Sequence, residues 1–273
     1  NGVTSSTTQN NQFLFDMFKT TLYLVNTKYT GNGQYKNSLH LFTGDQNYYV
    51  LENLLFINAN GGSNSIFQVT TCQTLRILRS VFMYTDPALS NVTVFNLDYA
   101  SDVRIVGCVF MFAGKVLVTN TIPEQLLFLD NTVITYSHSQ NIYVEKSASN
   151  IIDQNVFISQ DHSTPIPVSN SQIQIVDSVH SGVDLIKNNI FFSLTGGNGI
   201  VEINLNKNHF RTDLSSNIFI HNTGSQGGAI YVSSLFDEES LGPSFKYSVK
   251  IEKSAFLLNR AINSGTTKGK GGA

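Results

Sequence analysis

A short pattern of small and apolar residues recurs along the chain. Each copy begins with Asn or another small residue and continues with three mostly apolar positions. Consecutive copies start 23 to 37 residues apart, whereas the pattern keeps its length. Because only the spacing varies, we predict that loops absorb the variation. The eight copies begin at Asn53, Ser80, Cys108, Asn131, Asn155, Asn189, Asn217 and Ser254.

Two flanking positions support this alignment. The second residue after each start is always apolar: Leu55, Phe82, Phe110, Val133, Phe157, Phe191, Phe219 and Phe256. The third residue before each start played no part in finding the copies, and it is also apolar: Val50, Ile77, Ile105, Phe128, Ile152, Ile186, Leu214 and Ile251. In a chain that is 41% hydrophobic, chance would rarely produce this agreement. The copies are therefore interpreted as internal repeats.

Most repeats contain a further strand-like segment, as at residues 65–69, 115–118 and 199–203. Turns rich in Gly, Asn and Ser separate these segments, and no repeat has room for a crossover helix. Strands with this period pair with their equivalents in the next repeat, which is the geometry of a parallel β-helix. We predict an all-β chain: a right-handed, single-stranded parallel β-helix of about eight or more coils, its hand following the rule for parallel crossovers.

The domain organisation follows from where the repeats begin. We assign residues 31–273 to the β-helix and residues 1–30 to an N-terminal lead-in or cap. The segment Phe13–Phe18 is a candidate for covering the open end, which every solenoid must protect. A further strand is expected where the sequence stops at Ala273, so we expect the β-helix to continue beyond this fragment.

The column of Asn residues has two expected roles. Asn tolerates left-handed backbone, so we predict that these residues form the bend between two sheets. Stacked at about 4.8 Å per coil, their amides are also expected to hydrogen-bond to one another. The consecutive members Asn131, Asn155, Asn189 and Asn217 form the predicted asparagine ladder, whereas Ser80, Cys108 and Ser254 interrupt the column and Asn53 stands apart.

Charge and composition argue against several classes of function. Only 13% of residues are charged and the formal net charge is −2, so the chain lacks the basic face of a nucleic-acid-binding protein. No apolar run approaches the roughly 18 residues of a membrane-spanning helix. Cys72 and Cys108 cannot form a disulfide scaffold; a single disulfide and two buried free thiols both remain open.

The last third of the chain carries a more specific signature. Phe219-Ile-His-Asn222 precedes Gly227-Gly-Ala-Ile-Tyr231, and Phe256-Leu-Leu-Asn259 precedes Gly271-Gly-Ala273. This signature resembles the repeats of chlamydial polymorphic membrane proteins and related right-handed β-helix surface proteins of the pectin-lyase-like superfamily. The resemblance implies an extracellular or cell-surface region with a structural or adhesive role.

Catalytic chemistry is not predicted, although the superfamily also contains polysaccharide lyases and hydrolases. Glycoside hydrolysis needs two carboxylates facing one groove, and no acidic residues align in neighbouring columns of adjacent coils. His138 and His162 recur at one position of successive coils, but without a convincing third ligand we predict no metal site and no cofactor. The acidic run Asp237-Glu238-Glu239 is interpreted as a solvated loop.

Surface residues supply the remaining candidates. Arg76 and Arg104 fall in one column of adjacent coils, with Arg79 nearby, and are candidates for binding an acidic glycan or a partner's carboxylates. Asn91-Val-Thr93 is the single glycosylation sequon.

The residue three after each repeat start is expected to point outward, yet it is apolar throughout. Either another chain or segment covers this stripe, or the turn tucks it inside. The leading interpretation is a non-enzymatic structural or adhesive rod that self-assembles or binds a protein partner; the alternatives are a carbohydrate-active enzyme and a glycan-binding module. The stripe comprises Phe56, Met83, Met111, Ile134, Ile158, Phe192, Ile220 and Leu257.

Overall fold

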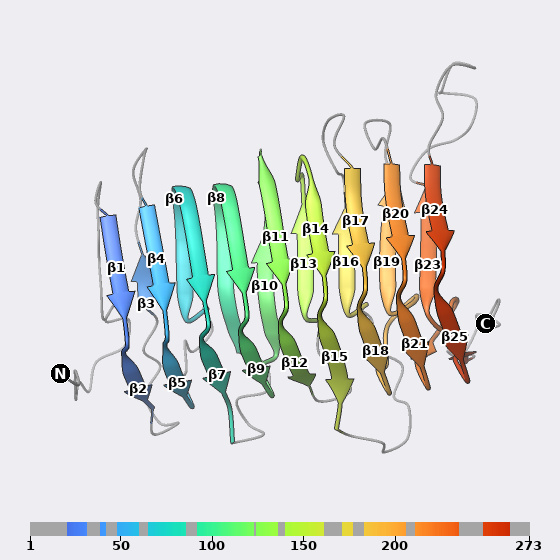
Figure 1. The fold of residues 1–273 in the computed structure, drawn as a ribbon, viewed down its shortest axis with the longest axis horizontal. Helices are drawn as coiled ribbons and strands as arrows, with labels where there is room; N and C mark the ends of the chain where they lie inside the picture. The colour runs from blue at the N-terminus through green and yellow to red at the C-terminus, as the bar shows by residue number, and fades with distance from the viewer. Residues whose placement is uncertain are drawn as a thin grey trace.

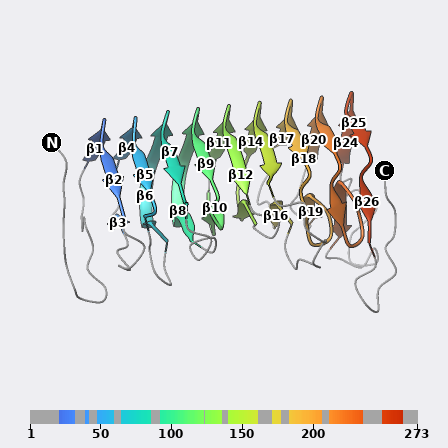
Figure 2. The same ribbon diagram turned by 90° about the horizontal axis from the view of Figure 1, so that it is seen from below.

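The protein is a parallel β-helix in which every strand pairing of the described residues is parallel (Figure 1). The computed structural model describes residues 21–31, 39–41, 48–59, 65–85, 92–122, 124–135, 140–160, 171–176, 183–205, 211–234 and 248–262. The chain winds through three faces, which we call the first, second and third face. Figure 2 shows the same stack from below, with its coils side by side from the N-terminal to the C-terminal end.

The strands divide among the faces as follows. The first face contains β3 (Leu39–Leu41), the first halves of β6 (Phe67–Leu78) and β8 (Thr93–Val106), β10 (Lys115–Thr119), β13 (Ile142–Glu145), β16 (Ile173–Val176), β19 (Val201–Leu205) and β23 (Ile230–Ser234). The second face contains β1 (Thr21–Val25), β4 (Tyr48–Glu52), the second halves of β6 and β8, β11 (Gln125–Leu129), β14 (Asn150–Asp153), β17 (Val183–Lys187), β20 (Arg211–Ser215) and β24 (Ser248–Glu252). Because β6 and β8 run through both faces, these strands join into one 15-stranded sheet.

The third face is a separate 9-stranded sheet of short strands. It contains β2 (Lys28–Thr30), β5 (Leu55–Ile57), β7 (Val81–Met83), β9 (Val109–Met111), β12 (Thr132–Thr135), β15 (Val156–Ser159), β18 (Ile190–Phe192), β21 (Ile218–Ile220) and β25 (Ala255–Leu257). A two-stranded sheet of β22 (Thr223–Gly224) and β26 (Arg260–Ala261) follows the last coils. The predicted all-β parallel β-helix is confirmed; its hand stays a prediction.

The predicted register is correct for seven of the eight repeats and wrong for the first. Phe56, not Leu55, pairs with Phe82, so the first repeat begins at Leu54. The preceding inward residue is accordingly Leu51 rather than Val50, because Leu51 pairs with Ile77. The error has a simple source: four apolar residues in succession, from Leu54 to Ile57, fit two alignments equally well.

The described part of residues 1–30 adds one more coil. β1 pairs with β4 and β2 pairs with β5, which places Leu24 beside Leu51 and Tyr29 beside Phe56. These residues pack against the core from the N-terminal side. The candidate capping segment, residues 13–18, lies outside the described residues, and the proposed division into lead-in and helix stays a prediction.

A stack of aromatic rings fills the interior behind the third face. Phe157, Phe191 and Phe219 are fully buried, and their ring centroids lie 5.1 and 4.6 Å apart with nearly parallel planes. Where Val133 replaces an aromatic residue, Phe128 of the second face bridges the gap, with ring centroids 6.2 Å from those of its neighbours on both sides. The inward column of the third face is therefore the central packing element of the fold.

The bend between the second and third faces corrects a second prediction. The left-handed residue is the one before the asparagine column, as at Arg79, Asp130 and Asn188 with φ of 47°, 54° and 54°. The ladder asparagines themselves do not have positive φ. The left-handed residue turns its side chain toward solvent, and the next residue then points into the interior, where its amide meets backbone groups of the adjacent coils.

Candidate functional surfaces

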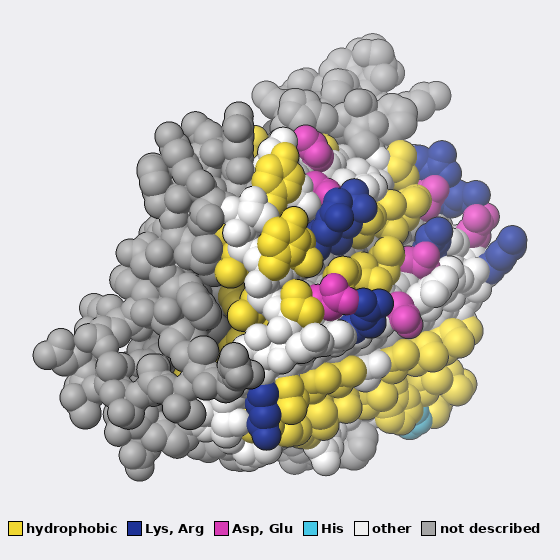
Figure 3. All heavy atoms as spheres, turned by 60° about the vertical axis from the view of Figure 1, so that its left-hand side comes forward, with side chains coloured by type: hydrophobic (Ala, Val, Ile, Leu, Met, Phe, Trp, Pro, Cys, Tyr) yellow, Lys and Arg dark blue, Asp and Glu magenta, His cyan; other side chains and the backbone are white. Residues whose placement is uncertain are grey.

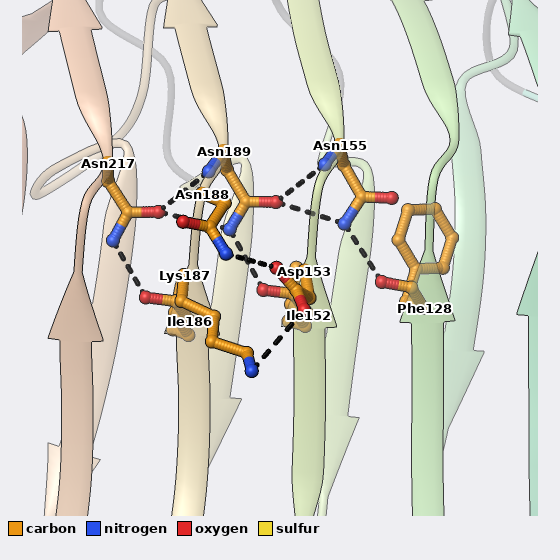
Figure 4. Close-up of polar contacts among 9 residues, drawn as sticks. All are labelled: Phe128, Ile152, Asp153, Asn155, Ile186, Lys187, Asn188, Asn189 and Asn217. Atoms are coloured by element: carbon orange, nitrogen blue, oxygen red, sulfur yellow. Dashed lines mark hydrogen bonds and ion pairs between the residues drawn. The ribbon is translucent and has the colours of Figure 1, made fainter.

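The asparagine ladder lies at the bend between the second and third faces (Figure 4). The Nδ2 atoms of Asn131, Asn155 and Asn189 each donate to the Oδ1 atom of the next asparagine in the column, over 3.0 to 3.1 Å. The same Oδ1 atoms accept the backbone N–H of the preceding asparagine at 2.8 to 3.1 Å. These side chains are at most 1% exposed, including that of Asn217. The ladder thus pairs backbone groups that the bend would otherwise leave buried without partners.

Smaller side chains end the ladder with the same chemistry. The backbone N–H of Asn217 donates to Ser254 Oγ over 3.2 Å, and that of Leu54 donates to Ser80 Oγ over 3.1 Å. The backbone N–H of Cys108 donates to Asn131 Oδ1 over 2.8 Å. The column is therefore a structural support rather than a surface that can bind a ligand.

The Phe-x-x-Asn signature forms a second ladder that the sequence reasoning did not identify. Asn222 Nδ2 donates to Asn259 Oδ1 over 2.9 Å, and the backbone N–H of Leu194 donates to Asn222 Oδ1 over 3.0 Å. Asn222 is fully buried and Asn259 is 9% exposed. This ladder closes the opposite end of the third-face strands, so the Asn of the signature has a direct structural role.

The Gly-Gly-Ala part of the signature permits close packing between coils. A Cβ atom on Gly228 would lie 2.6 Å from the backbone nitrogen of Arg260 in the next coil, and one on Gly227 would lie 2.3 Å from the carbonyl oxygen of Ile230. A larger residue at Gly228 would separate the coils, whereas one at Gly227 would collide with the backbone of its own turn. The sequence signature contains both the Asn and the Gly residues. Their structural roles become visible only in their contacts with the following coil.

The three candidate arginines lie on the outer surface of the second face and at its edge. Arg76 of β6 pairs in register with Arg104 of β8, as their shared column predicts. Arg104 Nε donates to both carboxylate oxygens of Asp102 over 3.0 and 2.9 Å. Arg79, at the bend, forms an ion pair with Glu52. Arg76 is exposed and forms no ion pair with the described residues, so of the three it is the arginine available to an external anion.

Several carboxylates of the second face are paired with basic neighbours. Asp213 accepts from Arg211 Nε over 2.6 Å, and Asp153 lies 3.4 Å from Lys187 Nζ. The hydrogen bond from Lys250 lowers the pKa of the Glu252 carboxyl. The lowered pKa favours the ionised form of Glu252, whereas glycoside cleavage requires one protonated carboxyl group.

Two carboxylates of the described residues are buried, and no sequence pattern predicted their burial. Glu202 is 5% exposed and accepts from Ser171 Oγ over 2.7 Å and from Asn198 Nδ2 over 3.1 Å. Asp184 is 1% exposed, and its Oδ1 accepts from the backbone N–H and the Nδ2 of Asn150 over 3.1 and 2.8 Å. Each joins neighbouring coils through hydrogen bonds, so both are interpreted as structural.

Both cysteines are free and buried, which resolves the alternative left open by the sequence. Burial raises the pKa of Cys72 to about 12, with Asp102 adding to the effect. Burial likewise raises the pKa of Cys108 to about 11, against the smaller opposing effect of backbone hydrogen bonds. Both thiols are therefore protonated and unreactive at neutral pH.

Other candidates lie outside the described residues: Asn91, His138, His162 and the run 237–239. Over the described ranges, no group of three or more His, Cys, Asp or Glu residues is arranged to hold a metal ion. The same ranges contain no helix with the length and hydropathy needed to cross a bilayer.

The third face carries apolar side chains on its outside as well as its inside. In each strand from β5 to β25, the second residue points inward and the first and third residues point outward, as the burial patterns of β7, β15 and β18 show. Exposure is greatest toward the C-terminal end, with Ile218 at 39% and Leu257 at 54%. Figure 3 shows the outward apolar side chains as two hydrophobic bands running side by side in the lower part of the view. We call this surface the apolar face; its members are Leu55, Ile57, Val81, Met83, Val109, Met111, Thr132, Ile134, Val156, Ile158, Ile190, Phe192, Ile218, Ile220, Ala255 and Leu257.

The burial of these residues shows which way the stripe predicted from the sequence points. Seven of its eight predicted members do point outward, so the turn does not tuck them inside. Phe56 is the exception and is 2% exposed, because the first repeat is shifted by one residue; Ile57 takes its place.

No family model, no curated protein and no solved structure matches the chain. The fold and the surfaces described above therefore carry the functional argument.

Proposed function

We propose that the protein is a non-enzymatic structural or adhesive β-helix rod of the cell surface or of an extracellular assembly. The observation that carries this proposal is the apolar face, which continues from β5 to β25 with Thr132 as its single polar member. Soluble monomers rarely expose a contiguous apolar patch of this extent, whereas interaction surfaces commonly do. Assembly of rods through this face would remove its apolar side chains from water.

The resemblance to chlamydial polymorphic membrane proteins supports an extracellular or surface location. The two residues that define the signature have structural roles here: Asn222 belongs to a ladder, and Gly228 permits close packing of coils. Membership in a pectin-lyase-like group, with repeats of the chlamydial type, is part of this proposal.

The paired carboxylates support the non-enzymatic part of the proposal. The test is incubation of the purified protein with polygalacturonate, alginate and related polymers, followed by assays for unsaturated products and reducing ends. No release above a buffer control is expected. Turnover that disappears when an outward carboxylate such as Asp98 or Glu145 is changed to its amide would overturn the proposal.

A second candidate function is binding of acidic glycans at Arg76. This side chain is exposed, lies in register with Arg104 and has no carboxylate partner among the described residues. Binding of acidic oligosaccharides should then weaken with salt and be lost in Arg76→Ala. Arg211→Ala is the matched control, because Asp213 already engages that guanidinium. Equal binding by both variants and the parent protein would reject this candidate.

A further inference from the structure

We propose that the apolar face binds a second copy of this chain, with the two third faces packed against each other and the two rods parallel. This inference rests on the proposed function, because it names the partner of the rod. The proposal follows from the regular register of the face, its size and the distribution of large and small side chains across it.

The strands of the third face keep one regular register along the stack of described coils. Each of its strands pairs residue by residue with the next, without an inserted residue, from Lys28 on β2 to Leu257 on β25. Sheets without bulges pack face to face with their backbones about 10 Å apart. The apolar face itself contains no charged side chain, so two copies meet without burying like charges.

The size of the apolar face matches one side of a stable interface. Ile190, Phe192 and Ile218 are 37%, 36% and 39% exposed. If each of the sixteen side chains of the face exposes roughly 50 Å², a third or less of the roughly 150–250 Å² that an aromatic side chain can bury, the face presents roughly 800 Å². A standard protein–protein interface buries about 800 Å² on each partner. A second copy therefore supplies a partner of the required size.

The side-chain volumes favour parallel rods. In most strands the first outward residue is smaller than the second, as in Val109 with Met111 and in Ala255 with Leu257. A two-fold axis along the rod places the column of smaller residues of one copy opposite the column of larger residues of the other. Large residues facing small ones interdigitate without voids. A two-fold axis along the strands would instead set large against large and small against small.

Sedimentation equilibrium tests the dimer. The parent protein is expected to reach twice the monomer mass, and Ile158→Lys with Ile220→Lys is expected to remain a folded monomer. The matched control is Ile151→Lys with Leu185→Lys, which places the same charges on outward aliphatic positions of the second face; it should still dimerise. A parent protein that stays monomeric at all concentrations, or a control that dissociates equally, would overturn the proposal.

A second measurement keeps the test decisive if the Lys variant unfolds. Val156→Cys and Ile158→Cys are prepared separately, and a short bismaleimide is used because packed sheets lie too far apart for a disulfide. The mixture of the two variants should yield cross-linked dimers much faster than either variant alone, and the buried Cys72 and Cys108 should not react. Equal cross-linking of a single variant with itself, or none in the mixture, would overturn the parallel arrangement.

Different results would reject the structural role and the interface with a second copy. Polymer cleavage would reject the structural role and leave the association measurements unaffected. A monomeric parent protein that cleaves no polymer would reject the second-copy interface while leaving a rod that binds another partner.

Discussion

Replacing Asn189 tests the asparagine ladder most directly, because this residue lies in its centre. Its Oδ1 accepts the backbone N–H and the Nδ2 of Asn155 over 2.9 and 3.0 Å. Its Nδ2 donates to the carbonyl of Ile152 over 2.9 Å and to Asn217 Oδ1 over 3.1 Å. Asn189→Ala removes all of these bonds and leaves a buried N–H without its partner.

The expected loss follows from the bonds removed. At about 1 kcal/mol for each hydrogen bond, Asn189→Ala should lower the free energy of unfolding by about 4 kcal/mol. Asn189→Ser is the graded control, because Ser254 and Ser80 show that a hydroxyl can accept the neighbouring N–H and donate to a nearby carbonyl. This variant keeps part of the network and should lose about 2 kcal/mol.

Urea denaturation followed by circular dichroism measures both losses, with the slope compared between variants to exclude a change in the unfolded state. Asn189→Asp adds a test of the donor. Its second oxygen would face two acceptors, so it should be less stable than Asn189→Ala at neutral pH and recover when acid protonates the carboxyl. A loss below about 1 kcal/mol for Asn189→Ala would refute the reasoning, because it would mean that the ladder contributes nothing beyond one ordinary hydrogen bond.

Three further predictions concern the core and the bends. Phe191→Ala should lower the free energy of unfolding by about 3–5 kcal/mol, whereas Phe192→Ala, on the outer side of the same strand, should cost about 1 kcal/mol or less when both are measured as monomers by urea denaturation. Gly228→Ala should cost about 1–3 kcal/mol because its Cβ would contact the backbone of the next coil, and unchanged thermal stability would contradict that contact. Cys72 and Cys108 should not react with Ellman's reagent until the protein unfolds. Because their folded pKa values of about 12 and 11 lie above the unfolded value of about 9, the stability they contribute is complete below about pH 9 and falls as pH rises through 11 and 12, which denaturation at stepped pH would detect.

The inward columns could be predicted from the sequence because burial leaves few choices. Ile152, Ile186 and Leu214 pair with one another inside the second face, and each must be apolar whatever the loops between them do. That requirement repeats in every coil, so the alignment could be found without knowledge of the fold. It was ambiguous only where apolar residues run without interruption, from Leu54 to Ile57.

The left-handed position could not be found in the same way. Arg79, Ser216 and Lys253 occupy it in different coils, with φ of 47°, 55° and 51°. Asn, Asp or Gly occupies the same position in five of the nine coils, at Asn26, Asn53, Gly107, Asp130 and Asn188, as left-handed backbone favours. The remaining coils carry other polar residues there, so this pattern is weaker than that of the inward columns. The buried Glu202 was equally hidden, because its burial depends on a hydroxyl from Ser171 of another coil.

Alternation along a strand explains what is unusual about the third face. A strand with one buried face normally places polar residues on the other. On the second face the chain follows this rule in part: β8 turns Asp102 and Arg104 outward, and they form an ion pair. A few residues later in the same coil, β9 turns Val109 and Met111 outward instead.

The contrast recurs elsewhere in the stack. In β20 the outward residues Arg211 and Asp213 form an ion pair, while in β21 of the same coil the outward residues are Ile218 and Ile220. The chain therefore supplies charged pairs where its outer surface meets water. In these two coils a general shortage of polar residues does not account for the apolar outer positions, since the second-face strand of the same coil carries a charged pair. The contact with another apolar surface proposed above would account for them, because such a contact would cover the third face and leave the second face in water.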